Sequence, residues 1–350
     1  MADVVEVVSL ARLSPDEIRR IEAVDPRLKL SEVGEWYDGE IRETWPARMT
    51  GNMPPAKAAP PPKAERDAAL AKAEIIIAGY PYPVDVQARS PRLKWFHARG
   101  AGANNLWYGD MWGATCSVTT GRGNVGPKAI AEYCVAALFY FVRDFRQAEA
   151  DKARAKFDRT LYSYSMISGS TVCIVGAGGI GQEAGKRFAA LGARVVGTRR
   201  DPKGTLPEGF SDMRGPDELH ALLAESDAAV LCVQLTQETK ELMDQAAFAA
   251  MKKGAILINI ARGEVVDEDA LLEALNSGHL GGAVLDVYTG ENEHPPPAEL
   301  WNHPRVLITP HNSGRGDRAR SFGFDVFCEN LRAYLDGRPL ANVIDWERGY

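Results

Sequence analysis

An arginine and a histidine each follow a short apolar run in the second half of the sequence. Arg262 comes after the run 256–260, and His311 lies just beyond 306–308. If both runs are strands of one parallel sheet, both side chains lie at its carboxyl edge, where such sheets bind ligands. A guanidinium can hold a planar carboxylate through two hydrogen bonds, and an imidazole can exchange a proton near neutral pH. The pair could therefore bind and protonate a small carboxylic acid.

A glycine-rich turn precedes this pair. Residues 176–181 read Gly-Ala-Gly-Gly-Ile-Gly, follow the apolar run 171–175 and precede a helical pattern at 183–191. In the order strand, turn, helix, the pattern G-x-G-x-x-G predicts a dinucleotide site, because glycines allow the tight turn and the close approach of a pyrophosphate. The pyrophosphate would meet free N–H groups at the start of the helix. The expected contacts there are Gly176, Gly178, Gly179, Ile180 and Gly181.

The end of the second strand, around 194–197, indicates which dinucleotide binds. An acid at this place usually receives the ribose 2′-hydroxyl of NAD, and an arginine the 2′-phosphate of NADP. Here Arg199 stands at the usual place of the acid, and Arg200 follows it. Two guanidiniums favour a phosphate dianion over a hydroxyl, so NADP(H) is expected. The alternative is NAD(H), with Asp201 on the ribose and the arginines in solvent.

Alternating apolar runs and helical patterns should position these residues. Strands are expected at 171–175, 194–197, 228–233, 255–260, 283–287 and 306–308. Such alternation favours a parallel sheet covered on both faces. The first half predicts strands at 4–8, 74–78 and 93–98, a helix capped by Ser14, and a Pro-rich loop at 54–62. Apolar residues at three- and four-residue spacing predict one long helix over 126–157, and another helix spans 318–335.

Length and charge exclude several classes of protein. The 350 residues suggest two domains. The formal net charge of −6 argues against a nucleic-acid-binding protein and against a protein that binds an anionic membrane surface, because both need a basic surface. There is no apolar run of about 20 residues and no basic, signal-like start, so a cytoplasmic location is expected. The five cysteines contain no C-x-x-C and the histidines no ligand spacing, so no metal site is predicted.

Three downstream segments carry a resemblance to a known family. They are Met-Lys-Lys-Gly-Ala-Ile-Leu-Ile-Asn-Ile-Ala-Arg-Gly at 251–263, Gly-Ala-Val-Leu-Asp-Val-Tyr at 282–288 and Val-Leu-Ile-Thr-Pro-His at 306–311. From about Leu93 to the C-terminus the chain resembles the D-isomer-specific 2-hydroxyacid dehydrogenases, and it is similar to their NADPH-preferring glyoxylate and hydroxypyruvate reductases. The resemblance implies hydride transfer between the nicotinamide cofactor and a 2-oxo or D-2-hydroxy acid.

The resemblance also assigns the catalytic roles. Arg262 would orient the substrate and polarise its carbonyl, and His311 would be the acid/base. Glu291 stands at the family's spacing from Arg262 and would hold the imidazole protonated. The family usually has Glu-Pro at this place, whereas Asn292 follows here, and Glu293 is a rival partner for His311.

Further contacts are implied by the same resemblance. The small-residue loop at 99–104 would bind the substrate carboxylate through Ala101 and Gly102, although Asn104 replaces the family's usual Asp. Arg99 is either a second substrate cation or a surface arginine. Asp286 would meet the nicotinamide carboxamide. The remaining expected cofactor contacts are Thr198, Val233, Gln234, Thr239, Ile260, Ala261, Arg262, His311, Ser313 and Gly314.

The expected fold is α/β, with two doubly wound parallel-sheet domains. A Rossmann cofactor domain at 123–313 would be inserted in a flavodoxin-like substrate domain formed by 1–122 and 314–350. The resemblance further implies a homodimer. The alternatives are a corepressor-like protein of the same fold that senses the dinucleotide, and an oxidase of another small anion such as phosphite. Formate-oxidising relatives typically carry Gln where Glu291 stands, which argues against that chemistry here.

Overall fold

The computed structural model describes residues 4–51, 53–55, 59–123, 126–317 and 322–350, with only the backbone at 322 and 323. Contacts divide the chain into two compact units. Unit 1 comprises Met1–Val125 and Arg318–Tyr350, and unit 2 comprises Gly126–Asp317. Both are built on parallel sheets with helices alternating with strands. None of the helices described is long and apolar enough to cross a membrane.

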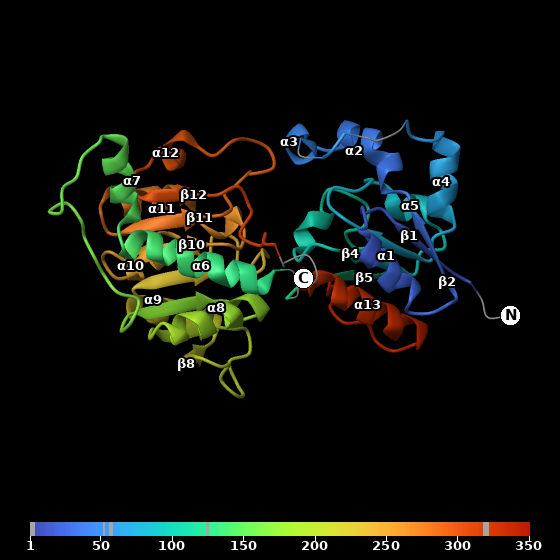
Figure 1. The fold of residues 1–350 in the computed structure, drawn as a ribbon. Helices are drawn as coiled ribbons and strands as arrows, with labels where there is room; N and C mark the ends of the chain where they lie inside the picture. Colours follow the sequence, from blue (N-terminus) through green and yellow to red (C-terminus); the bar gives the residue numbers. More distant parts are fainter. Residues whose placement is uncertain (1–3, 52, 56–58, 124–125, 318–321) are drawn as a thin grey trace. The chain divides into compact units, whose positions relative to one another are not determined.

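Unit 1 contains a five-stranded sheet in the order β2-β1-β3-β4-β5 (Figure 1). The strands are β1 (Val5–Ser9), β2 (Leu28–Glu32), β3 (Ile75–Ala78), β4 (Trp95–Ala98) and β5 (Ser117–Thr120). Around them lie α1 (Pro15–Glu22), η1 (Gly34–Tyr37), α2 (Asp38–Thr44), α3 (Ala47–Thr50), α4 (Lys63–Ala71), α5 (Val86–Arg89), η2 (Ala103–Leu106) and α13 (Phe322–Leu335).

Alternating side chains of the unit 1 strands build two core layers. Val7 and Ile75 pack with α1 and α13, whereas Val8 and Ile76 pack with α2, α4 and α5 on the other face. Burial on both faces explains why β3 is an uninterrupted apolar run. The predicted cap of α1 is present, since the Ser14 side chain accepts from Glu17 N and the Glu17 side chain accepts from Ser14 N.

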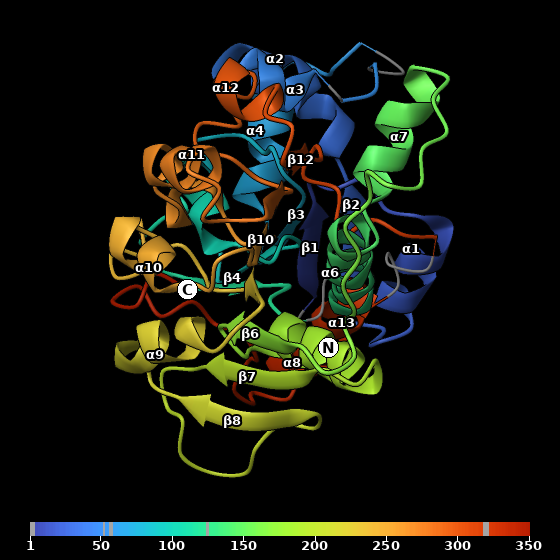
Figure 2. The same cartoon turned by 90° about the vertical axis from the view of Figure 1, so that its left-hand side faces the viewer.

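Unit 2 contains a seven-stranded sheet in the order β12-β11-β10-β9-β6-β7-β8. The strands are β6 (Thr171–Val175), β7 (Arg194–Thr198), β8 (Phe210–Arg214), β9 (Ala228–Leu231), β10 (Ile256–Asn259), β11 (Gly282–Leu285) and β12 (Val306–Ile308). The helices are α6 (Pro127–Val142), α7 (Phe145–Ala153), α8 (Gly179–Ala190), η3 (Pro216–Glu218), α9 (Leu219–Ala224), α10 (Gln245–Ala250), η4 (Gly263–Val265), α11 (Glu268–Asn276) and α12 (Ala298–Trp301). Helices α6 and α8 cover one face of the sheet, and α9, α10 and α11 cover the other (Figure 2).

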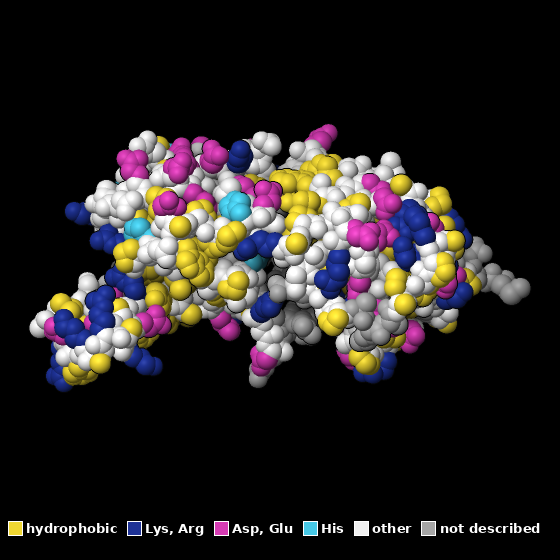
Figure 3. Space-filling view, turned by 90° about the horizontal axis from the view of Figure 1, so that it is seen from above, with side chains coloured by type: hydrophobic (Ala, Val, Ile, Leu, Met, Phe, Trp, Pro, Cys, Tyr) yellow, Lys and Arg dark blue, Asp and Glu magenta, His cyan; other side chains and the backbone are white. Residues whose placement is uncertain are grey.

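The prediction of a single helix over 126–157 is wrong. The chain forms α6 and α7, separated at Asp144, whose φ of +53° is incompatible with a continuous helix. The buried Asp144 carboxylate explains the break, because Oδ2 accepts a hydrogen bond from Ser163 N at 3.1 Å and thereby holds the chain that returns from α7. At the lower left of Figure 3, the segment around α7 carries basic and hydrophobic side chains side by side.

Other elements differ less from expectation. The polar strands β2, β5 and β8 were not predicted, since none is a continuous apolar run. The described part of the Pro-rich segment forms neither helix nor strand, while 56–58 lie outside the described residues. Of the predicted C-terminal helix, 322–335 is helical and 318–321 lie outside the described residues.

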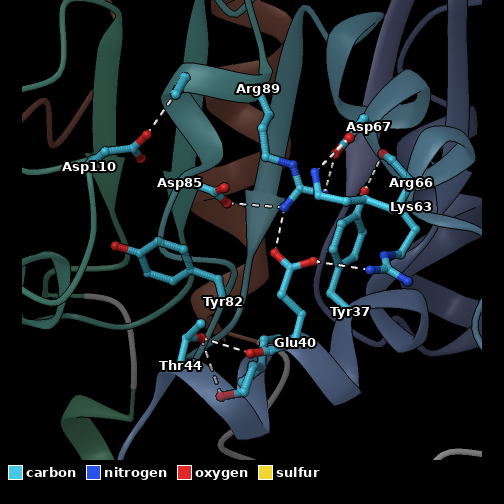
Figure 4. Close-up of polar contacts among 12 residues, drawn as sticks. Tyr37, Glu40, Thr44, Lys63, Arg66, Asp67, Tyr82, Asp85, Arg89 and Asp110 are labelled. Carbon is cyan, nitrogen blue, oxygen red and sulfur yellow. Dashed lines mark hydrogen bonds and ion pairs between the residues drawn. The ribbon is translucent and has the colours of Figure 1, made fainter.

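A partly buried cluster of ion pairs ties three helices of unit 1 together (Figure 4). Arg89 of α5 lies at its centre, 2.5 Å from Glu40 of α2, 2.7 Å from Asp67 of α4 and 3.1 Å from Asp85. Its guanidinium also lies over the Tyr37 ring. Burial alone would lower the pKa of Arg89, but Asp85 and Glu40 outweigh it and raise that pKa. The cluster fixes α2 at a defined place beside the sheet.

Candidate active site

His311 lies on a sharp turn directly after β12. Its φ of +48° is in the left-handed region, and its N–H donates to Asp286 O at 2.9 Å and Thr309 O at 3.0 Å. The ring nitrogen Nδ1 lies 2.8 Å from Glu291 Oε1. Because a carboxylate can only accept, Nδ1 carries the hydrogen, which leaves Nε2 for proton exchange with a ligand. The imidazole is half exposed, whereas the Glu291 side chain is 17% exposed.

Asp286 organises the turn that carries His311. This residue follows β11 and is buried. Its Oδ1 accepts from Thr309 Oγ1 at 2.6 Å and from Asn312 N at 2.9 Å, and its Oδ2 accepts from Ser313 N at 2.9 Å. A carboxylate has about four acceptor positions. Those three bonds leave one for the predicted contact with a carboxamide, which stays a prediction.

Tyr133 and Thr309 extend this network into α6, and the sequence did not single them out as site residues. Tyr133 Oη lies 2.6 Å from Thr309 Oγ1. Burial raises the pKa of Tyr133 well above its usual value, so the phenol stays protonated. Because Thr309 gives its only hydrogen to Asp286, Tyr133 must donate to Thr309. Tyr133 on α6, Thr309 directly after β12 and Asp286 directly after β11 thus form one chain of hydrogen bonds.

Arg262 sits on a turn shaped by Asn259, another residue that the sequence did not single out. The buried Asn259 side chain donates to Arg262 O at 2.9 Å and accepts from Ala261 N at 3.0 Å. The guanidinium Nη1 donates to Ala261 O at 2.6 Å. A Cβ on the next residue, Gly263, would lie 2.0 Å from the carbonyl carbon of Tyr288. The Ala-Arg-Gly sequence therefore packs this turn against the segment leading to Glu291.

The segment carrying Glu291 has its own support. Glu268, at the start of α11, accepts from Thr289 N at 2.7 Å, and burial raises the pKa of Glu268. Tyr288 Oη donates to His294 O at 2.6 Å. The side chain that contacts His311 Nδ1 is therefore Glu291, rather than its sequence rival Glu293.

The glycine turn has the geometry that a dinucleotide requires. Gly176 has a φ of +96°, and a Cβ there would lie 2.8 Å from Val233 Cγ1. A Cβ on Gly181 would lie 2.4 Å from Gly176 O. A Cβ on Gly178, by contrast, would meet no described atom within 4 Å. Gly179 and Ile180 begin α8, whose cap Gly178 supplies no side chain, so the first N–H groups of the helix are available to a pyrophosphate.

The two arginines after β7 are held by different loops, Arg199 by its own and Arg200 by the loop after β9. Arg199 Nη2 donates to Lys203 O at 2.7 Å, while its buried Nε has no hydrogen-bond partner among the described residues. Arg200 lies 3.0 Å from Glu238. Thr198 Oγ1 accepts from Gly176 N at 3.2 Å and so joins the two cofactor segments.

The other predicted cofactor residues lie at the same edge of the unit 2 sheet. Thr239 Oγ1 donates to Gln234 O at 2.6 Å and accepts from Thr236 N, so this hydroxyl shapes the loop after β9. Ile260 and Ala261 are buried directly after β10. Ser313 is buried on the Asp286 turn, and Gly314 follows it. Cofactor contact by each of these residues stays a prediction.

The predicted substrate loop belongs to unit 1. Arg99, directly after β4, donates to Glu17 at 2.5 Å and lies over the Phe324 ring. Gly100 O accepts from Gly121 N at 2.9 Å, and Gly102 precedes η2. Arg99 is therefore a partly buried, paired cation rather than a solvated surface arginine. No group of three or more potential metal ligands occurs among the described residues.

Comparison with known proteins decides the family. The family model for the NAD binding domain of D-isomer specific 2-hydroxyacid dehydrogenases matches residues 135–313. The chain belongs to the D-isomer specific 2-hydroxyacid dehydrogenase family. Its relatives in this dehydrogenase family include a D-specific alpha-keto acid dehydrogenase of Enterococcus faecalis, 32% identical over 273 residues, which cover 74% of this chain and 77% of that protein.

Two further dehydrogenases extend the comparison. The D-3-phosphoglycerate dehydrogenase of Methanocaldococcus jannaschii is 30% identical over 266 residues, which are 75% of this chain and 49% of that enzyme. The chain thus spans about half the length of this relative. A D-isomer specific 2-hydroxyacid dehydrogenase from Xanthobacter autotrophicus, solved with NADPH and MES, has a TM-score of 0.77 and 27% identity, covering 100% of both chains.

Proposed function

We propose that this family member reduces a 2-oxo acid to a D-2-hydroxy acid with NADP(H), in a reversible reaction. The observation that carries the proposal is the contact of 2.8 Å between His311 and Glu291. Arg262, Glu291 and His311 follow the neighbouring strands β10, β11 and β12 at one edge of the sheet. They supply a cation and a supported acid/base, which are the groups that reduction of a 2-oxo acid needs.

Bound at the glycine turn 176–181 and the arginines after β7, NADPH would supply the hydride for C2 of the oxo acid. Arg262 binds the carboxylate and polarises the carbonyl, since its planar fork matches two oxygens. His311, protonated at Nε2, gives its proton to the carbonyl oxygen as negative charge develops there. Glu291 accepts the Nδ1 hydrogen bond and so fixes the orientation of the ring, with Nε2 turned to the substrate. In unit 1, the backbone N–H groups of Ala101 and Gly102 are proposed to hold the substrate carboxylate.

The proposed preference for NADP(H) rests on Arg199 and Arg200. A hydrogen bond to a charged group contributes about 1.5–3 kcal/mol. We therefore expect Arg199→Ala and Arg200→Ala each to lower kcat/KM for NADPH about 10- to 100-fold, with a much smaller change for NADH. Arg194→Ala is the matched control, because Arg194 lies at the other end of β7 and pairs with Glu225 at 2.7 Å. A wild-type preference for NADH would overturn the proposed coenzyme.

A homodimer is proposed from exposed apolar side chains around α7. Phe145, Phe157, Leu161, Tyr164 and Met166 are all exposed, Phe157 to 88%. Large exposed apolar groups on one segment are typical of an interface. Light scattering should give twice the mass of the chain, and Phe157→Ser with Met166→Ser should weaken the association. A monomer at micromolar concentration would contradict this proposal.

Absorbance at the NADPH band tests the reaction itself. Glyoxylate, hydroxypyruvate, pyruvate and branched or aryl 2-oxo acids are each added with NADPH and then with NADH. We expect NADPH oxidation with at least one acid and a product of D configuration. If no acid is reduced with either coenzyme, the proposed function is wrong.

A further inference from the structure

A cavity of 310 Å³ opens at the carboxyl edge of the unit 1 sheet. It is lined by Leu10 and Arg12 after β1, by Tyr80 and Pro81 after β3, and by Arg99 after β4. In the strand order of unit 1, the connections leave in opposite directions from β1 and β3, and sheets of this kind bind ligands at such a point. Arg99 also begins the loop proposed to hold the substrate carboxylate. The cavity and that loop are therefore adjacent parts of one unit.

The cations in the cavity are already neutralised. Arg12 Nη2 lies 2.7 Å from Asp38, whose side chain is only 7% exposed, and Arg12 Nε lies 3.5 Å from Glu35. Arg99 lies 2.5 Å from Glu17. An adjoining hollow adds Arg20, which is paired with Asp325. A second anionic group on a ligand would come close to these carboxylates, and their repulsion would offset its attraction to the arginines.

The rest of the cavity wall is apolar and held in place. Ile41 of α2, Met53, Tyr80 and Pro81 line it. The Tyr80 ring packs edge-on against Trp45 at 5.0 Å, and Trp45 Nε1 donates to Tyr82 O at 2.6 Å. The ion-pair cluster around Arg89 fixes α2, which carries both Ile41 and Asp38. This wall is preformed and suits a neutral group by shape.

We propose that this cavity receives the side group of the 2-oxo acid and selects a neutral apolar group over a second anionic group. The inference rests on the proposed function. Its matched probes are 4-methyl-2-oxopentanoate and oxaloacetate, because their side groups, CH2–CH(CH3)2 and CH2–COO⁻, have the same number of heavy atoms. One well-placed methylene in an apolar pocket changes kcat/KM about 10- to 200-fold. We expect the branched acid to exceed both oxaloacetate and pyruvate at least about tenfold in kcat/KM.

Two variants link this ratio to the cavity. Asp38→Asn removes the buried negative charge beside Arg12 while keeping an acceptor oxygen there, and it should shift the ratio of the two probes about tenfold toward oxaloacetate. Ile41→Ala removes apolar wall and should lower the ratio of 4-methyl-2-oxopentanoate to pyruvate by a similar factor. If Ile41→Ala does not fold, Ile41→Val allows the same ratio to be measured with a smaller loss of apolar wall. Val4→Ala is the matched control, because Val4 is exposed and lies outside the cavity.

The outcomes separate this inference from the proposed function. Reduction of the branched acid with the expected shifts in Asp38→Asn and Ile41→Ala supports the inference. Equal or faster reduction of oxaloacetate, or ratios that stay within twofold in both variants, overturns it while leaving the proposed function in place. If neither these acids nor any other 2-oxo acid is reduced, both fall together.

Discussion

Replacing Thr309 by valine removes the hydroxyl that joins Tyr133 to Asp286 while keeping the shape of the side chain. The hydroxyl makes two contacts of 2.6 Å, one to each partner. Losing a hydrogen bond to a charged group costs about 1.5–3 kcal/mol, and a buried donor left without a partner costs about 1–3 kcal/mol more. Since Tyr133 is only partly buried, we expect the free energy of unfolding to fall by about 2–4 kcal/mol.

Thr309→Val should also lower kcat, because it loosens the turn that carries His311. Asp286 would keep Asn312 N and Ser313 N but lose the bond that anchors Oδ1 to the strand end. A displacement of about 1 Å at a reacting group can cost about 100-fold in rate. We therefore expect kcat for the best 2-oxo acid to fall about 10- to 100-fold.

Urea denaturation and steady-state kinetics measure the two effects. Thr309→Ser keeps the hydroxyl and serves as the matched control, with kcat expected within about threefold of the wild type. Tyr133→Phe and the double variant with Thr309→Val complete a cycle, whose coupling energy should lie at about 0.5–3 kcal/mol. The reasoning is refuted if Thr309→Val changes the free energy of unfolding by less than about 0.5 kcal/mol and kcat by less than about twofold.

Three further variants test other parts of the account. Arg89→Met removes the centre of the ion-pair cluster and should cost about 2–3 kcal/mol of unfolding free energy in urea, less than a fully buried pair because Asp67 and Asp85 are partly exposed. Lys63→Met, at a side chain 68% exposed, should cost less than about 1 kcal/mol, and equal costs would contradict the burial argument. Burial lowers the pKa of His97 to about 3, so below pH 6.5 the unfolded chain takes up a proton that the folded chain does not, and stability is lost as pH falls. Denaturation at pH 7 and pH 5 should show His97→Gln losing less stability over this interval than the wild type, by at most about 1.4 kcal/mol per pH unit, and parallel losses would contradict the assignment. Gly263→Ala places a Cβ against the Tyr288 backbone and should lower both stability and kcat, whereas Gly39→Ala in α2, where a Cβ meets nothing within 4 Å, should leave stability unchanged or slightly higher; an intact Gly263→Ala enzyme would show that the contact can relax.

Local patterns predicted the elements that depend on neighbouring residues. The capping box at Ser14 and the glycine turn at 176–181 require only residues a few positions apart, and the structure forms both. The alternation of apolar runs and helical patterns from 171 onward likewise predicted the parallel sheet of unit 2, because strands buried on both faces are apolar runs. The strand β8, by contrast, is polar at Ser211 and Asp212 and carries no such signal.

Features that depend on distant partners were not predictable in this way. The break at Asp144 follows from a bond to Ser163, and helical spacing of apolar residues says nothing of it. Tyr133 belongs to the apolar stripe of α6, yet its hydroxyl meets Thr309, 176 positions away. Asn259 lies within the recognised motif at 251–263, but its role in shaping the Arg262 turn depends on the geometry of that turn. The motif at 251–263 identified the segment that carries Arg262, and the structure shows that the Asn259 side chain shapes its turn.

The most direct test of the central claim compares wild-type enzyme with His311→Ala, using the best 2-oxo acid and saturating NADPH. Loss of a positioned general acid typically costs about 100- to 10,000-fold. We expect a loss of kcat in this range, with the dissociation constant for NADPH, measured by fluorescence, staying within about threefold. Reduction of the acid at the wild-type rate by His311→Ala would contradict the claim that His311, supported by Glu291, delivers the proton.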